Sequence, residues 1–129
     1  METQILTPDG IVFQDEVIGL QVPGEQGSFE IKKNHANLIS NLDIGRIRAQ
    51  LNEMETQYFA VSGGFVEVVD NKIYLLAEAA ERNDEIDQQR AENAKERAEE
   101  HLKDKEMDHE RARKAWLRAE NRLKIAAHG

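Results

Sequence analysis

The sequence predicts an α+β fold, with a β-sandwich of roughly 8–10 short strands followed by an antiparallel two-helix hairpin. Three observations predict it. Apolar and polar residues alternate between turn signals over residues 1–81, whereas residues 82–129 are almost all good helix formers. Both prolines and every glycine except Gly129 lie in the first part. That part also carries the whole formal charge of −8, since acidic and basic residues balance in the second.

Turn chemistry divides residues 1–81 into short strands. Thr7-Pro8-Asp9-Gly10 predicts a turn, because proline presets φ and glycine accepts the unusual φ that follows. Val17–Val22 is rich in aliphatic residues and ends at the turn 23–27. Residues 46–51 alternate apolar and polar side chains, as a half-buried strand does. We therefore expect antiparallel strands and no helices between them.

The same signals continue to residue 81. We expect a strand over Thr56–Val61 that Ser62-Gly63-Gly64 breaks. Phe65–Val69 and Lys72–Ala77 then flank Asp70-Asn71, which predicts a two-residue hairpin loop.

The C-terminal part predicts two helices. Asn83 or Asp84 is suited to cap the first helix. Alanine-rich stripes at helical spacing let two helices approach closely, so an antiparallel hairpin is expected. The proposed corner, 103–108, has no glycine or proline and permits either a fixed hairpin or one long helix. A hairpin that can straighten is a candidate switch. The stripes comprise Ala91, Ala94, Ala98 and Leu102, then Ala112, Ala115, Trp116, Ala119, Leu123 and Ala126.

Composition excludes several functions. Cysteine is absent, which excludes disulfides and thiolate chemistry. No apolar run is long enough to cross a bilayer and no signal peptide is recognisable, so we expect a peripheral, intracellular protein. An acidic sandwich without a basic aromatic face is unsuited to nucleic acid. The histidines are scattered, and no metal-ligand spacing, Walker loop or nucleophile–base set is present, so we expect no metal site and no catalysis by this chain.

Several segments together resemble one family. Besides Thr7-Pro8-Asp9-Gly10 they are Pro23-Gly24 with Gly27, His35-Ala36, Phe59–Val68 and Ala77–Glu81, in order along the whole chain. The chain is similar to the epsilon subunit of F-type ATP synthases. The resemblance implies a non-catalytic subunit of the rotating central stalk, which couples the catalytic alpha/beta head to the c-ring during proton-driven ATP synthesis. It also implies binding to the gamma subunit and a place at the cytoplasmic face of the bacterial plasma membrane.

One stretch departs from the family pattern. A glycine has become Glu30, and two prolines have become Lys33 and Asn37. Glu30 must then take an ordinary L-residue conformation, or the loop must be rearranged. The resemblance implies that the region around His35 faces the c-ring.

Arginines recur at helical spacing in the C-terminal part. Arg90 and Arg97 are seven residues apart, as are Arg111 and Arg118, so each pair shares a helix face. Spacing alone leaves two interpretations open: a cradle for polyphosphate, or ordinary solvated charge.

The resemblance bears on that choice, because Ile/Leu-Asp-x-x-Arg-Ala is the motif of ATP-binding epsilon subunits. It implies that ATP is a regulatory ligand of the closed hairpin and that no cofactor is required. It also implies that the open hairpin inhibits ATP hydrolysis through basic contacts to the beta subunit. The implied ATP-binding residues are Glu81, Ile86, Asp87, Arg90, Ala91, Arg97, Arg118 and Arg122. The implied inhibitory contacts are Arg111, Arg113, Lys114, Arg118 and Arg122.

Two other functions fit the composition. One is a free-standing β-sandwich binding module with a helical interaction tail, and the other is a helical adaptor unrelated to nucleotide. Co-purification with an ATPase head would separate both from the rotor subunit.

Overall fold

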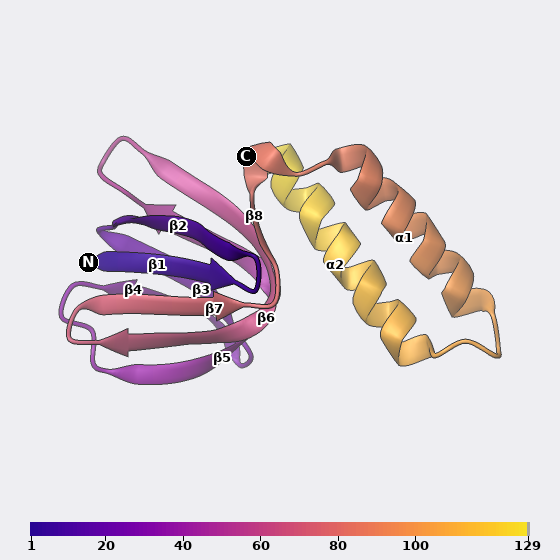
Figure 1. Ribbon diagram of the computed structural model, residues 1–129, viewed down its shortest axis with the longest axis horizontal. Coiled ribbons are helices and arrows are strands. Elements are labelled where there is room, and N and C mark those ends of the chain that lie inside the picture. The colour runs from indigo at the N-terminus through magenta and orange to yellow at the C-terminus, as the bar shows by residue number, and fades with distance from the viewer. Residues whose placement is uncertain (129) are drawn as a thin grey trace.

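The computed structural model describes residues 1–128 and consists of a β-sandwich with a helical hairpin at one end (Figure 1). Gly129, the last residue of the predicted helical part, lies outside the described residues. The strands are β1 (Glu2–Thr7), β2 (Gly10–Glu16), β3 (Gly19–Gly24), β4 (Gly27–Lys32), β5 (Leu38–Gln50), β6 (Thr56–Val69), β7 (Lys72–Ala77) and β8 (Ala80–Arg82). A 3-10 turn, η1 (Asn83–Glu85), leads into α1 (Gln88–Lys103) and α2 (His109–His128). The predicted fold class is confirmed.

One continuous sheet folds over to make both layers of the sandwich. Its order is β2-β1-β7-β6-β5-β3-β4, with β8 also paired to β6. The two long strands, β5 and β6, pair along their whole length and take part in both layers. Toward its C-terminal end β6 pairs with β7, whereas near its start it pairs with β8.

The expected break at Ser62-Gly63-Gly64 is wrong, because β6 runs through it from Thr56 to Val69. Gly63 and Gly64 have φ of +75° and +119°, which bends the strand without ending it. A Cβ on Gly64 would lie 2.0 Å from the carbonyl oxygen of Leu76 on β7. Gly64 therefore lets β7 approach where β6 passes from one layer to the other.

The predicted loop at Asp70-Asn71 is confirmed. Val69 pairs with Lys72, and both loop residues have positive φ (48° and 64°), as a type I′ turn requires.

The core of the sandwich consists of large aliphatic side chains around Phe59. Phe59 is fully buried, and the ring of Phe13 meets it edge-on with centroids 5.3 Å apart. Ile5, Ile47 and Leu75 are equally buried. Ile5, Ile47 and Leu75 alternate with less buried residues along their strands, as the sequence pattern predicts, whereas Phe59 begins a run of three buried residues.

The first helix begins later than expected. Neither Asn83 nor Asp84 caps it, since residues 83–85 form the 3-10 turn. Asp87 is the N-cap, and its Oδ1 accepts a hydrogen bond from the Arg90 backbone N–H at 3.0 Å.

Two aspartates explain how the hairpin turns without glycine or proline. The Oδ1 of Asp104 accepts from the backbone N–H of Glu106 at 2.9 Å, which favours a turn directly after α1. The Oδ1 of Asp108 accepts from the backbone N–H of Arg111 at 3.1 Å and caps α2. The bend therefore has local stabilisation, although every residue in it tolerates a helix.

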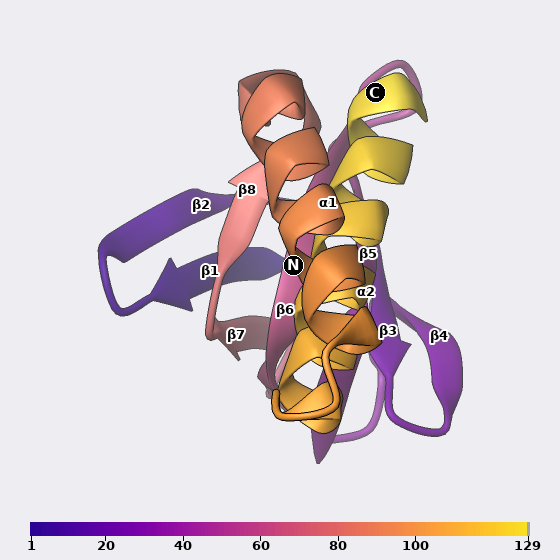
Figure 2. The same cartoon turned by 90° about the vertical axis from the view of Figure 1, so that its right-hand side faces the viewer.

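The hairpin lies across one end of the sandwich, with α2 toward the sheet and α1 on the outside (Figure 2). The α2 helix packs on β5, β6 and η1, and α1 packs on α2. The seam between the helices is lined by buried alanines, as the sequence predicts. They are Ala91, Ala98, Ala112 and Ala119.

Candidate functional site

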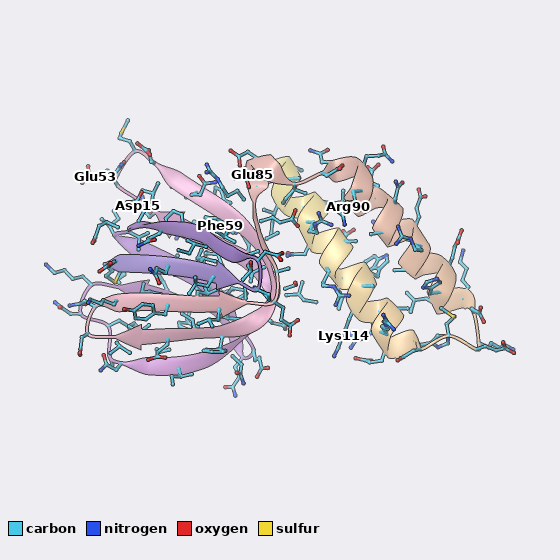
Figure 3. The ribbon with its side chains drawn as sticks, in the orientation of Figure 1. Asp15, Glu53, Phe59, Glu85, Arg90 and Lys114 are labelled. Atoms are coloured by element: carbon cyan, nitrogen blue, oxygen red, sulfur yellow. The ribbon has the colours of Figure 1, made fainter. Side chains whose placement is uncertain are left out.

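The cleft cavity lies where the hairpin meets the sandwich and has a volume of about 480 Å³. The sheet contributes Ser62 of β6 and Glu81 of β8 to its wall. Arg90 reaches it from α1 (Figure 3), and Arg118 and Arg122 reach it from α2. The sheet and the two helices thus bring three arginines together with three carboxylates, which are Asp9, Glu78 and Glu81.

Glu81 and Arg122 form the ion pair that joins the sheet to α2. The Glu81 Oε1 lies 2.6 Å from Arg122 Nε, and its Oε2 accepts a hydrogen bond from Nη2 at 3.0 Å. Both side chains are partly buried, with exposed fractions of 34% and 22%. The shielded position makes this pair stronger than an ordinary surface ion pair.

Arg90 and Arg118 have no such partner. Within residues 1–128 neither side chain forms an ion pair or a hydrogen bond. Glu81 pairs with Arg122, so Arg90 and Arg118 are left without an ion-pair partner on opposite helices of the cavity wall, which Asp9 and Glu78 also line. This arrangement is suited to an anion that bridges α1 and α2.

The other predicted ATP-binding residues lie outside the cavity wall. Ile86 is buried in a cluster with Ala60 and Ile125, and Ala91 is fully buried. Asp87 caps α1, as described above. In this closed hairpin these three residues therefore hold α1 in place beside the cavity.

Arg97 lies in a neighbouring cavity of about 600 Å³, which we call the turn cavity. Arg97, His101 and Ala94 of α1 and Arg111 and Arg118 of α2 line it. Ala94 and Arg118 belong to both cavities, so the two are adjacent along one side of the hairpin.

The remaining members of the predicted inhibitory set lie on α2 away from the cleft cavity. Arg113 donates to Glu110 Oε1 at 2.8 Å. That hydrogen bond lowers the pKa of Glu110 and raises the pKa of Arg113. Lys114 is exposed at the turn end of α2 (Figure 3).

Sequence comparison decides the family. Residues 1–83 match the β-sandwich domain of the ATP synthase delta/epsilon chain, and residues 84–127 match the long α-helix domain of the same chain. The chain is 46% identical over 99 residues to the ATP synthase epsilon chain of Syntrophomonas wolfei, covering 77% of this chain and 72% of that one. It is 48% identical over 101 residues to the epsilon chain of Koribacter versatilis, with 78% and 70% covered. The chain belongs to the ATP synthase epsilon chain family.

Solved structures agree on the fold of this epsilon chain. A chain of the Euglena gracilis mitochondrial ATP synthase superposes with a TM-score of 0.71 at 19% identity, covering 98% of this chain and 77% of that one. A chain of the Tetrahymena thermophila enzyme, from a structure of its central stalk and c-ring, gives 0.64 at 18% identity, with 98% and 96% covered. Epsilon chains are non-catalytic. Within residues 1–128, no group of acidic or histidine side chains is arranged to hold a metal ion, and neither helix could span a membrane.

The far end of the epsilon chain shows how its unusual loop is held. The Asn34 backbone N–H donates to Asn71 Oδ1 at 2.7 Å, and Asn71 Nδ2 donates to Asn34 Oδ1 at 3.2 Å. The Asp70 backbone N–H donates to Asn37 Oδ1 at 2.9 Å. Asparagine amides therefore fix the His35 loop to the β6–β7 turn. Glu30 sits in regular strand β4, opposite Gln21, so the departure there needs no rearrangement.

The sequence could not predict several polar contacts between α1 and α2 or between α2 and the sheet, because the two residues of each contact lie on different elements. The Nδ2 of Asn121 donates to the Gly45 carbonyl at 2.8 Å and fixes α2 to β5. Lys95 and Glu120 pair at 2.7 Å, and Trp116 Nε1 donates to Glu99 Oε1 at 3.0 Å. The hydrogen bond between Lys95 and Glu120 raises the pKa of the amine and lowers that of the carboxyl.

Proposed function

We propose that this epsilon chain is a rotor subunit of a bacterial F-type ATP synthase, at the cytoplasmic face of the plasma membrane. In this role it couples the catalytic head to the c-ring during proton-driven ATP synthesis. Its mobile hairpin brakes ATP hydrolysis and responds to ATP. The family membership and the fold support the rotor role, and the cleft cavity with its unpaired arginines supports the response to ATP.

Residues 1–81 act as the anchor in this proposal, and residues 82–129 act as the regulatory unit. An exposed apolar row crosses four strands of the sandwich and is suited to the gamma subunit. Leu6 pairs with Ile11 on one side and with Leu76 on the other, and Leu76 pairs with Phe65. Ile11 and Leu76, which lie on either side of Leu6, are 58% and 42% exposed, and such a row of exposed aliphatic side chains is unusual.

The anchor is tested with a chain that ends at Arg82, which keeps β8 in the sheet. We expect this chain to bind the gamma subunit, and Leu76→Asp in the full chain to abolish that binding. Met54→Asp is the matched control, because Met54 is 92% exposed and outside the row. Loss of gamma binding by a folded 1–82 chain would refute the division of roles.

The loop around His35 is the proposed contact with the c-ring. Its asparagine hydrogen bonds hold it in one conformation before the ring is met, so little ordering entropy would be lost on binding. Asn71→Ala removes both contacts with Asn34 and should weaken c-ring assembly without affecting gamma binding.

ATP is the proposed ligand of the closed hairpin. Arg90 and Arg118 would hold its phosphates from opposite helices, Arg97 would extend the contact toward the turn, and Asp87 would accept from the adenine amino group. Because the arginines come from both helices, the site exists only when the helices lie antiparallel. ATP would then favour the closed state through its differential affinity for it.

Without ATP the helices would open and inhibit hydrolysis. In the open form the inhibitory arginines and lysine of α2 would meet acidic surface on the beta subunit. Arg118 and Arg122 would leave the cleft cavity for these contacts, so these two arginines would serve in both states. Alanine at all five positions should relieve inhibition in the reconstituted enzyme, and unchanged hydrolysis would exclude electrostatic docking.

The observation that carries the ATP proposal is the pair of unpartnered arginines on facing helices. Calorimetry on the whole chain tests it. Each charge-assisted contact is worth about 1.5–3 kcal/mol, so Arg90→Ala and Arg118→Ala should each weaken ATP binding about tenfold or more. Arg113→Ala is the control, because Arg113 pairs with Glu110 outside the cavity. If the wild-type chain binds no ATP at millimolar concentration, the proposed response of the hairpin to ATP fails for this protein.

A further inference from the structure

The hairpin is joined to the sandwich through one helix and packs on it through the other. The chain leaves η1 and enters α1 at Gln88, and α1 packs chiefly on α2. The contacts with β5, β6 and η1 are made by α2. The bend at residues 104–108 links α2 to the rest of the chain, and it lies at the end of the hairpin far from the sandwich (Figure 1). The packing of α2 on the sheet therefore does not require that both belong to the same copy of the chain.

The surface that receives α2 combines two polar contacts with an apolar one. The Nδ2 of Asn121 donates to the Gly45 carbonyl at 2.8 Å. Arg122 pairs with Glu81, and Ile125 is buried against apolar residues of β6 and of the link between η1 and α1. We call this surface the α2 dock. Its residues are Gly45, Ala60, Glu81 and Ile86.

Removal of α2 would leave the α2 dock without partners. Glu81 would lose the guanidinium group that pairs with it, and a partly shielded carboxylate without a partner is unfavourable. Ala60 and Ile86, which are buried, would be exposed to water. The matching face of α2 would be vacant as well. Two open copies are therefore complementary, since each offers both a vacant dock and the helix that fits it.

The contacts that hold the bend are all local to it. The Asp104 carbonyl accepts from the Met107 backbone N–H at 3.3 Å and from His109 Nε2 at 2.7 Å. The side chains of Asp104 and Asp108 accept from nearby backbone N–H groups, as described above. In a straight helix the same backbone groups would bond along the helix, because residues 104–108 contain no glycine or proline. Straightening therefore breaks no ion pair or hydrogen bond between α1 and α2.

We propose that two copies of this epsilon chain exchange their α2 helices and form a domain-swapped dimer. In this dimer α1 and α2 of each copy make one continuous helix, the two long helices lie antiparallel, and a sandwich stands at each end. Each α2 occupies the α2 dock of the other copy and packs on the other copy's α1. All contacts of α2 are formed again between copies, and only those of the bend are lost.

The exchanged dimer also builds each cleft cavity from two copies. Arg90 comes from the copy that supplies the sandwich, whereas Arg118 and Arg122 come from the other. The exchange shares the opening of the bend with the proposed inhibitory state, but it does not depend on ATP. A copy in the dimer has no free α2 to offer to the beta subunit, so the exchange would withhold the inhibitory helix of an unassembled chain.

Sedimentation velocity of the full chain tests the exchange at micromolar to millimolar concentration, after refolding from urea to let the helices open. We expect wild type to pass from monomer to dimer as concentration rises. A variant that combines Asp104→Ala and Asp108→Ala removes the side-chain contacts of the bend and favours a straight helix. Its association constant should be about tenfold higher or more, because two bends are lost in each dimer.

Lys105→Pro should prevent the exchange. Asp104 has φ of −88° and ψ of 120°, the extended conformation favoured before proline, and the Lys105 backbone N–H makes no hydrogen bond within residues 1–128. Proline therefore fits the bend but breaks a continuous helix. We expect this variant to stay monomeric at every concentration, with the Trp116 fluorescence of the closed hairpin. Lys105→Ala is the matched control and should dimerise at least as readily as wild type.

A pair of charge-reversed chains distinguishes exchange from side-by-side association. Glu81→Arg and Arg122→Glu each place like charges together in the monomer and in its own exchanged dimer. A mixed exchanged dimer restores both ion pairs, because each dock meets the α2 of the other variant. Refolding the two chains together should therefore yield mainly the mixed dimer, which native mass spectrometry separates from both homodimers by mass. Without exchange, mixing restores no ion pair.

Three results would overturn the exchange. One is that wild type and the double alanine variant both remain monomeric at millimolar concentration. Another is that Lys105→Pro dimerises as readily as Lys105→Ala. The third is that the charge-reversed chains form no more mixed dimer than homodimer. Failure of the ATP proposal gives a different result, namely a chain that binds no ATP but dimerises as expected.

Discussion

The sandwich and the hairpin are stabilised by different means. In the sandwich, large side chains such as Phe59, Ile47 and Leu75 are fully buried between two layers. In the hairpin, the buried seam consists of alanines, and the longer contacts are polar ones at its margins. An alanine removes far less apolar surface from water than a leucine or phenylalanine does. The closed hairpin is therefore stabilised by several small contributions, and the binding free energy of a ligand can exceed any one of them.

This difference matches the division of roles proposed above. A rigid anchor needs a core that ligands cannot shift, and the sandwich has one. A regulatory element needs two states of similar free energy, and a thin seam with a bend made by Asp104 and Asp108 meets that need. Stability is thus concentrated in one half of the molecule.

The largest effect is expected from the sandwich core. Phe59→Ala removes a fully buried ring and its edge-on contact with Phe13, so we expect a loss of about 3–5 kcal/mol in the free energy of unfolding. Chemical denaturation followed by far-ultraviolet circular dichroism measures it. Met54→Ala, at a 92% exposed position, should change the midpoint very little. Equal effects of the two changes would mean that the core does not dominate stability.

A smaller effect is expected in the seam. Ala98 is 3% exposed between the helices, so Ala98→Leu should separate them at a cost of about 1–3 kcal/mol to the closed hairpin. The sandwich should keep its unfolding midpoint. Fluorescence of Trp116, the single tryptophan, reports the change because its indole hydrogen bonds to Glu99 across the seam. Ala127→Leu, at an exposed position of α2, is the matched control. An unchanged signal in Ala98→Leu would show that the seam is wider than described.

The smallest effect concerns pH. The hydrogen bond from Lys95 holds the pKa of Glu120 below its ordinary value of 4.5. A carboxyl with a lowered pKa in the folded state stabilises that state above its ordinary pKa, and the contribution is lost as pH falls through the lower folded-state value. The closed hairpin should therefore be insensitive to this pair near neutral pH and should loosen only below pH 4.5.

Trp116 fluorescence between neutral and acidic pH checks this prediction. The Lys95 and Glu120 side chains are 30% and 26% exposed, so solvent still screens the pair and the change should be slight. Glu120→Gln should remove that part of the pH dependence, and an identical acid profile in this variant would assign the loosening to other carboxyl groups.

The sequence by itself determined the fold class, the hairpin loop at Asp70-Asn71 and the alanine seam. Each of these depends on local conformation or on periodicity, which a single segment of sequence contains. The start of α1 was misplaced because Asn83, Asp84 and Asp87 are all good capping residues, and only the η1 turn decides among them. Likewise Gly63-Gly64 can end a strand or bend it, and the proximity of β7 selects the bend.

The tertiary structure alone decided which charges meet. Helical spacing showed that Arg90 and Arg97 share a face, but the packing of α2 places them in two different cavities. The partners Glu81 and Arg122 lie 41 residues apart, and no periodicity connects them. Ion pairs form between elements whose relative position depends on the whole fold. A sequence pattern therefore identifies candidate charged residues but does not assign their ion-pair partners.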